Sequence, residues 1–117
     1  MKFYELNESI INVLVPKEST GTYLLGNKIG NNFFIKYTGR SDLRLKKRLI
    51  DHAKSRKYTY FSFFLTETIQ RAYEIECREW HNAIDLDNKI HPRKPKNLDY
   101  KCPYCCKKNG GFKLWKI

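Results

Sequence analysis

The stretch GTYLLGNKIGNNFFIKYTGRSD, residues 21–42, decides the fold. It contains two apolar runs, and each run carries one tyrosine tied to one glycine, in Gly21-Thr22-Tyr23 and in Tyr37-Thr38-Gly39. The two runs favour strands at residues 22–25 and 33–38, joined by a loop rich in Asn and Gly, which tolerate positive φ. We therefore expect a β-hairpin. A hairpin does not by itself require two tyrosine–glycine pairs, so the tyrosines suggest a second role.

The chain after the hairpin predicts a helix, a strand and a second helix. Asp42 is a candidate N-cap for a helix over residues 43–55, where leucines recur at helical spacing. Residues 58–65 (YTYFSFFL) are short and aromatic, which is typical of a central strand. Thr66 or Thr68 then opens a helix that ends at about residue 83.

The predicted order is β-β-α-β-α, an α/β fold of the α+β type with a small three-stranded sheet, mixed or antiparallel, and flanking helices. Residues 9–15 (SIINVLV) fit a short strand or the end of a lead-in arm. We assign residues 1–84 to this domain, with its core at 20–84. Residues 85–117 hold three of the four prolines and show no periodicity, which predicts an irregular extension packed on the same domain.

The bulk composition is that of a basic, folded chain of 117 residues with 23 Lys and Arg against 12 Asp and Glu, a net charge of +11. Such a charge favours a partner with a phosphate backbone, although solubility alone could explain it. We find no apolar run long enough to span a membrane and no signal peptide at the amino terminus, so we expect a cytoplasmic protein with reduced cysteines.

One carboxylate stands in an unexpected place on the second helix. Ile69, Ala72, Tyr73, Glu76 and Trp80 form one helical stripe, and four of these five residues are apolar. A stripe of this kind faces the sheet, where an unpaired carboxylate is costly. Glu76 either reaches water at the edge of the stripe or meets a metal ion or a basic partner.

The two triplets resemble the signature of the GIY-YIG nucleases, with threonine in place of isoleucine in both. The resemblance covers about residues 20–84 and includes Arg48 and His52 on the first helix and Glu76 on the second. It implies a metal-dependent endonuclease that hydrolyses DNA phosphodiester bonds, with RNA not excluded.

The resemblance also implies a role for each site residue. Glu76 would hold one Mg²⁺ or Mn²⁺ against the scissile phosphate, and Arg48 would grip that phosphate as a planar fork. Tyr23, Tyr37 and His52 are alternative general bases or water-ordering groups. The candidate substrate-binding residues are Gly39, Arg40, Arg44 and Lys47.

Two other functions fit parts of the pattern. A catalytically inactive nucleic-acid adaptor would keep the fold, and a zinc-ribbon protein that binds another protein would explain the tail but not Glu76. If the chain is an endonuclease, a specific double-strand cut would require a homodimer or a partner protein, because no separate recognition domain is visible.

The cysteines predict a second, structural metal site. Cys102-x-x-Cys105 is a typical half of a zinc site and needs two further ligands. Cys77 and His81 stand at i and i+4 on the second helix and could complete it, while His91 competes with His81 for the fourth place. Free thiols and a thioredoxin-like redox pair are the alternatives, and Cys106 would be a spare thiol.

Overall fold

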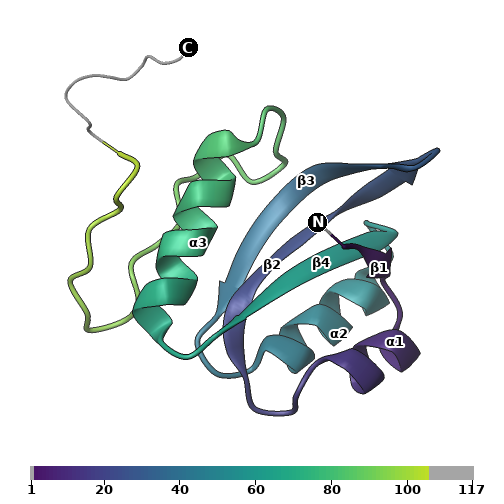
Figure 1. The fold of residues 1–117 in the computed structure, drawn as a ribbon, viewed down its shortest axis with the longest axis horizontal. Helices are drawn as coiled ribbons and strands as arrows, with labels where there is room; N and C mark the ends of the chain where they lie inside the picture. Colours follow the sequence, from purple (N-terminus) through teal and green to yellow (C-terminus); the bar gives the residue numbers. More distant parts are fainter. Residues whose placement is uncertain (1, 106–117) are drawn as a thin grey trace.

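The computed structural model describes residues 2–105, and the fold is a four-stranded antiparallel sheet with helices on both faces (Figure 1). The elements in chain order are β1 (Tyr4–Glu5), α1 (Glu8–Leu14), β2 (Thr20–Ile29), β3 (Asn32–Ser41), α2 (Leu45–Ser55), β4 (Tyr60–Thr66) and α3 (Ile69–Asn82). The strand order is β1-β4-β2-β3, so β3 is an edge strand and β4 is interior, as its aromatic run predicts.

The alternation of side chains along β2 sorts the site residues onto two faces of the sheet. Tyr23 and Leu25 point toward α1 and α2, where they join the main core with Ile11, Leu49 and Phe61. Thr22 points the other way, and its hydroxyl donates to the carbonyl of Ala72 in α3 at 2.6 Å. The same two-residue period along β3 puts Tyr37 on the face of Tyr23, and Arg40 on the face of α3.

The hairpin is longer than its apolar runs suggest. Residues 27–29 and 32 pair in register, so that the polar loop shrinks to Gly30 and Asn31. Gly30 adopts a φ of 60°, the left-handed conformation that glycine takes without strain. The expected loop is therefore mostly a two-stranded ribbon that extends beyond β4, because backbone pairing needs no apolar side chains.

Residues 9–14 belong to helix α1 and Val15 is its C-cap, so this run is neither a strand nor an arm. The side chain of Asn7 caps α1 by accepting the backbone N–H of Ile10 at 2.9 Å, and Ile11 and Val15 pack into the core one turn apart. The β-branched composition of this run made a strand plausible, but the cap and the i, i+4 burial decide for a helix. Strand β1 has two residues, too few for any periodic signal.

The cap of α2 also differs from the prediction. Ser41, not Asp42, accepts the backbone N–H of Arg44, at 2.7 Å, and the N–H of Leu45 reaches the carbonyl of Ser19 at 3.1 Å. The side chain of Asp42 is drawn instead to Arg40. The cap of α3 is as predicted, since Thr68 accepts the N–H of Arg71 at 3.0 Å.

A candidate active site and a candidate metal centre

An open cavity of about 330 Å³ lies at the end of β3 that carries the second triplet. Residues from both faces of the sheet line it: Tyr23, Tyr37 and Arg48 from one side, and Arg40 and Glu76 from the other. Residues 88 and 90–93 supply the remaining wall. The structure thus brings together four of the five predicted catalytic residues around one space, and the fifth, His52, lies directly behind Tyr23.

Tyr23 and His52 form a hydrogen-bonded pair. The phenol oxygen of Tyr23 lies 3.0 Å from Nε2 of His52, and the ring of Tyr37 packs against both side chains. Tyr23 is fully buried in the fold and contributes to the lining of the cavity. The two tyrosines therefore belong to one cluster with His52, which answers why the hairpin carries both.

Gly39 makes room for Tyr23. A Cβ at this position would overlap the end of the Tyr23 ring, including its phenol oxygen. The sequence made Gly39 a candidate substrate-binding residue, and it does line the cavity. The space beside its Cα is occupied by the end of the Tyr23 ring. Because Gly39 has no side chain, the phenol can pack against β3 at this point and reach the cavity.

The pKa values of this pair are shifted in opposite directions. Burial, and then the proximity of Tyr37, raise the pKa of the Tyr23 phenol far above its usual 10, while Arg48 acts against this shift. Burial, and then Arg48, lower the pKa of His52 below 6.5. At neutral pH the phenol therefore keeps its proton and the imidazole is neutral, so Tyr23 can donate to Nε2 of His52.

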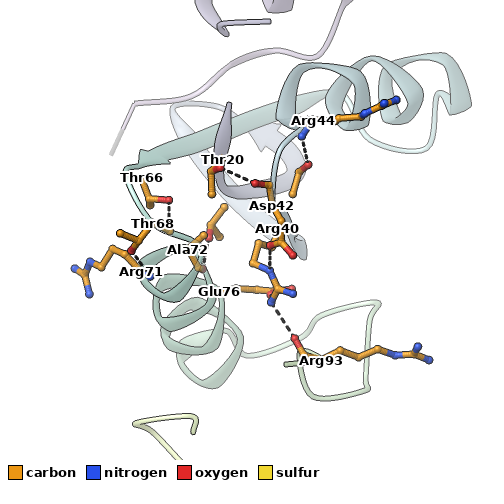
Figure 2. Close-up of polar contacts among 12 residues, drawn as sticks. Thr20, Arg40, Asp42, Arg44, Thr66, Thr68, Arg71, Ala72, Glu76 and Arg93 are labelled. Carbon is orange, nitrogen blue, oxygen red and sulfur yellow. Dashed lines mark hydrogen bonds and ion pairs between the residues drawn. The ribbon is translucent and has the colours of Figure 1, made fainter. Parts of the chain in front are cut away.

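The basic partner of Glu76 is Arg40. One Arg40 amine, Nη1, donates to Oε1 of Glu76 at 2.8 Å and to the carbonyl of Arg93 at 2.9 Å. Its Nε donates to Asp42 at 2.8 Å, and its guanidinium lies over the ring of Tyr73. Figure 2 shows Arg40 between Asp42, Glu76 and the carbonyl of Arg93, with the side chain of Arg93 directed away from it.

Glu76 is slightly more enclosed than Arg40, with 10% of its side chain exposed against 12%. Burial raises the pKa of this carboxyl to about 7, even though the bond from Arg40 favours its ionised form. The expectation of an inward carboxylate with a basic partner is met. A divalent cation bound by Glu76 would compete with a proton for the same carboxylate oxygens.

The other candidate substrate-binding residues lie in different surroundings. Arg40 is bound by protein groups on three sides and has little freedom to grip a substrate. Arg44, the N-cap residue of α2, and Lys47 on that helix are exposed and line a separate basic hollow that includes Lys17 and Lys54. Neither residue lines the cavity that contains Glu76.

Four side chains near the carboxyl end of the described chain form a candidate metal centre. The ligand atoms of His81, His91, Cys102 and Cys105 all lie within 4.8 Å of one another. Nε2 of His81 is 3.5 Å from Sγ of Cys102 and 3.3 Å from Sγ of Cys105, and Nε2 of His91 is 3.1 Å from Sγ of Cys105. This His₂Cys₂ group could hold a metal ion.

The second contacts of these side chains suit metal binding. Nδ1 of His91 lies 2.8 Å from the carbonyl of Pro92, and because a carbonyl only accepts, Nδ1 carries the proton and Nε2 presents its lone pair. The backbone N–H of Tyr104 points at Sγ of Cys102 at 3.4 Å, as it would toward a thiolate. The single thiol proton of Cys105 cannot hydrogen-bond to the imidazole nitrogens of both histidines at once, whereas a metal ion between these side chains could be bound by all of them.

The group that the structure brings together does not include Cys77. Cys77 shares a helix face with His81 and is fully buried one turn earlier on α3, where its thiol lies beside that of Cys102. The two histidines, which the sequence made rivals, both join the group. Cys106 and the rest of residues 106–117 lie outside the described residues.

Sequence reasoning also missed how residues 85–93 are held. The side-chain amide of Asn88 accepts a hydrogen bond from the backbone N–H of Thr38 and donates one to its carbonyl. The guanidinium of Arg40 donates to the carbonyl of Arg93. The only available signal was the absence of periodicity, which indicated a segment held by something other than its own core.

No protein-family model, curated protein or solved structure matches this chain. Among the helices described, none combines the length and the apolar character needed to cross a membrane.

Proposed function

We propose that this protein is a metal-dependent endonuclease of the GIY-YIG type that hydrolyses DNA phosphodiester bonds. One observation carries the proposal. Tyr23, Tyr37, Arg48 and Glu76, far apart in sequence and on both faces of the sheet, meet at one cavity with His52 bonded to Tyr23. These are the residue types that activate a water, neutralise a phosphate and hold a divalent cation.

The proton from the attacking water would travel through Tyr23 to His52. The raised pKa of Tyr23 disfavours a free phenolate, so the phenol serves better as a relay than as a standing base. The water gives its proton to the phenol oxygen while the phenol proton passes to Nε2 of His52, 3.0 Å away. The lowered pKa of His52 keeps it neutral and ready to accept. Tyr37 packs on both rings and orders them.

Glu76 is the residue that would hold Mg²⁺ or Mn²⁺ in this site. An enclosed carboxylate that lines an open cavity fits such an ion, which is usually held by one or two carboxylates together with water and substrate phosphate. When bound, the ion supplies neutralisation of charge on the phosphoryl and leaving oxygens. Arg48, also on the cavity wall, would bind the same phosphate and keeps its charge at any working pH.

The His₂Cys₂ group is proposed to hold one structural Zn²⁺. Two ligands at ordinary Zn–S and Zn–N distances stand about 3.5 Å apart in a tetrahedron, close to the 3.1–3.5 Å between nitrogen and sulfur atoms here. Four protein ligands leave no open position, which is typical of structural zinc.

Cleavage of supercoiled plasmid tests the nuclease. We expect nicking only when Mg²⁺ or Mn²⁺ is added. The metal-free comparison uses buffer cleared of divalent ions beforehand and not EDTA, because EDTA in the sample would also remove zinc. Glu76→Gln and Arg48→Ala should each reduce the rate by ~10²-fold or more. Glu74→Gln, on the same helix but paired with Arg71 at the surface, is the matched control. Wild-type rates in both site variants would refute the mechanism.

The adaptor function makes a different prediction in the same samples. An adaptor would bind duplex DNA, with an affinity that falls log-linearly with salt, and would leave it intact under every divalent ion. Salt-dependent binding without nicking would therefore favour the adaptor.

Elemental analysis tests the zinc centre. We expect about one zinc per chain in the wild type and in Cys77→Ser, and its loss in Cys105→Ser. A wild type free of zinc that keeps the same resistance to protease would refute this site.

A further inference from the structure

Residues 85–93, which we call the strap, run along the free edge of β3. The backbone N–H of Asp87 donates to the carbonyl of Lys36 at 2.6 Å, and the side-chain amide of Asn88 bonds both backbone groups of Thr38. The carbonyl of Arg93 accepts from Arg40. The strap thus meets alternate residues of β3: it binds backbone groups of Lys36 and Thr38 that an edge strand leaves unpaired, and the side chain of Arg40.

The strap also belongs to the metal centre. His91 lines the cavity and supplies one of the four ligand atoms. Trp80 of α3 donates its indole N–H to the carbonyl of Asn88 at 3.0 Å, and its ring packs edge-on against His91. One short segment is therefore held at β3 by hydrogen bonds and, two residues before Arg93, by the His₂Cys₂ group.

Arg40 connects the strap to the carboxylate of the cavity. A single guanidinium amine, Nη1, binds Oε1 of Glu76 and the carbonyl of Arg93, and so fixes these two oxygens relative to each other. Nε holds Asp42 at the same time. A planar fork can meet three such acceptors together, whereas the ammonium of a lysine cannot reproduce that geometry.

We propose that zinc at the His₂Cys₂ group sets the position of Glu76 for its divalent cation, with the strap and Arg40 as the positioning elements. This inference rests on the proposed function of Glu76. It makes the two metal sites one unit, in which the Mg²⁺ or Mn²⁺ affinity of the cavity depends on zinc bound elsewhere.

The physical reason is the low intrinsic order of the strap. The strap buries only two apolar residues, Leu86 and Pro92, and most of its other side chains are exposed, so it has little core of its own to offset its conformational entropy. An ion shared by α3, the strap and Cys102-x-x-Cys105 closes two loops at once. Without the ion, the carbonyl of Arg93 leaves Arg40, and the guanidinium is free to follow Glu76 and to compete with the incoming cation.

The test measures Mn²⁺ binding by electron paramagnetic resonance in the absence of nucleic acid. Mn²⁺ prefers oxygen ligands, so it reports on Glu76 and not on the cysteine-containing centre. We expect zinc-loaded wild type to bind Mn²⁺ and Glu76→Gln to lose that binding. Cys105→Ser, without zinc, should bind Mn²⁺ at least tenfold more weakly, the range seen when outer partners of a metal ligand are removed.

Arg40→Lys separates positioning from folding. It keeps the charge and all four zinc ligands, so zinc content should stay near wild type, while Mn²⁺ affinity falls about tenfold and the Mg²⁺ concentration for half-maximal cleavage rises by the same factor. Arg71→Lys, an exposed arginine of α3 outside the cavity, is the matched control and should change neither.

The outcomes separate the two levels of inference. Mn²⁺ affinity that is unchanged in both Cys105→Ser and Arg40→Lys would overturn the coupling while leaving the nuclease proposal in place. Zinc-loaded wild type that neither binds Mn²⁺ nor cleaves DNA would overturn the proposed function itself. Zinc-dependent Mn²⁺ binding without cleavage would support the coupling and reject the hydrolytic role.

Discussion

Replacement of Glu76 by glutamine should change how the stability of the fold depends on pH. Burial raises the pKa of this carboxyl from 4.5 to about 7, so between these values the folded protein binds a proton that the unfolded chain has released. The stability associated with this group is therefore complete below pH 4.5 and is lost as the pH rises through 7. Glutamine cannot ionise, and it can still accept the hydrogen bond from Arg40.

The magnitude follows from the shift. A displacement of about 2.5 pKa units corresponds to about 3 kcal/mol of unfolding free energy, at roughly 1.4 kcal/mol per unit. About 2 kcal/mol of this should develop between pH 5.5 and 8.5, because that range covers most of the titration of the folded state. The glutamine variant should gain that amount over wild type on going from the lower pH to the higher.

Urea unfolding of the zinc-loaded proteins at both pH values, without other divalent ions, provides the measurement. The difference between variant and wild type cancels the contributions of His52 and of the metal centre, which both proteins share. Glu74→Gln should follow wild type at both pH values. Parallel pH profiles for wild type and Glu76→Gln would show that burial does not disfavour this carboxylate, and the reasoning would fail.

Three further substitutions test other parts of the site. Gly39→Ala should destabilise the protein by about 2 kcal/mol or more and slow cleavage, because the new Cβ overlaps the ring of Tyr23; chemical denaturation and plasmid nicking measure the two effects. The NMR titration of His52 should give a pKa below 6.5, and Arg48→Gln should raise it, since Arg48 is the second cause of the shift after burial; an unchanged value would remove Arg48 from the pair's environment. Thr38→Val should stabilise the fold by about 1 kcal/mol, because the buried Thr38 hydroxyl has no hydrogen-bond partner among the described residues; a loss of stability on thermal unfolding would reveal a partner.

The sequence by itself determined the features that depend on neighbours in the chain. The alternation of the hairpin, the aromatic run of β4 and the cap at Thr68 are local patterns, and each predicts its element. The helical stripe that contains Glu76 predicted an inward carboxylate, because the 3.6-residue period fixes which side chains share a face. The spacing of Cys102 and Cys105 likewise indicated a metal group.

Only the tertiary structure decided which partners these residues meet. Glu76 is joined to Arg40, 36 positions away, because α3 packs on the face of the sheet to which Arg40 points. Helical spacing put Cys77 and His81 on one face of α3. Spacing does not encode how deeply each residue lies in the fold, and packing of the helix buries Cys77 while it places His81 near His91. The strap shows no periodicity because its order comes from the edge of β3 and from the metal group, and both exist only once distant segments have come together.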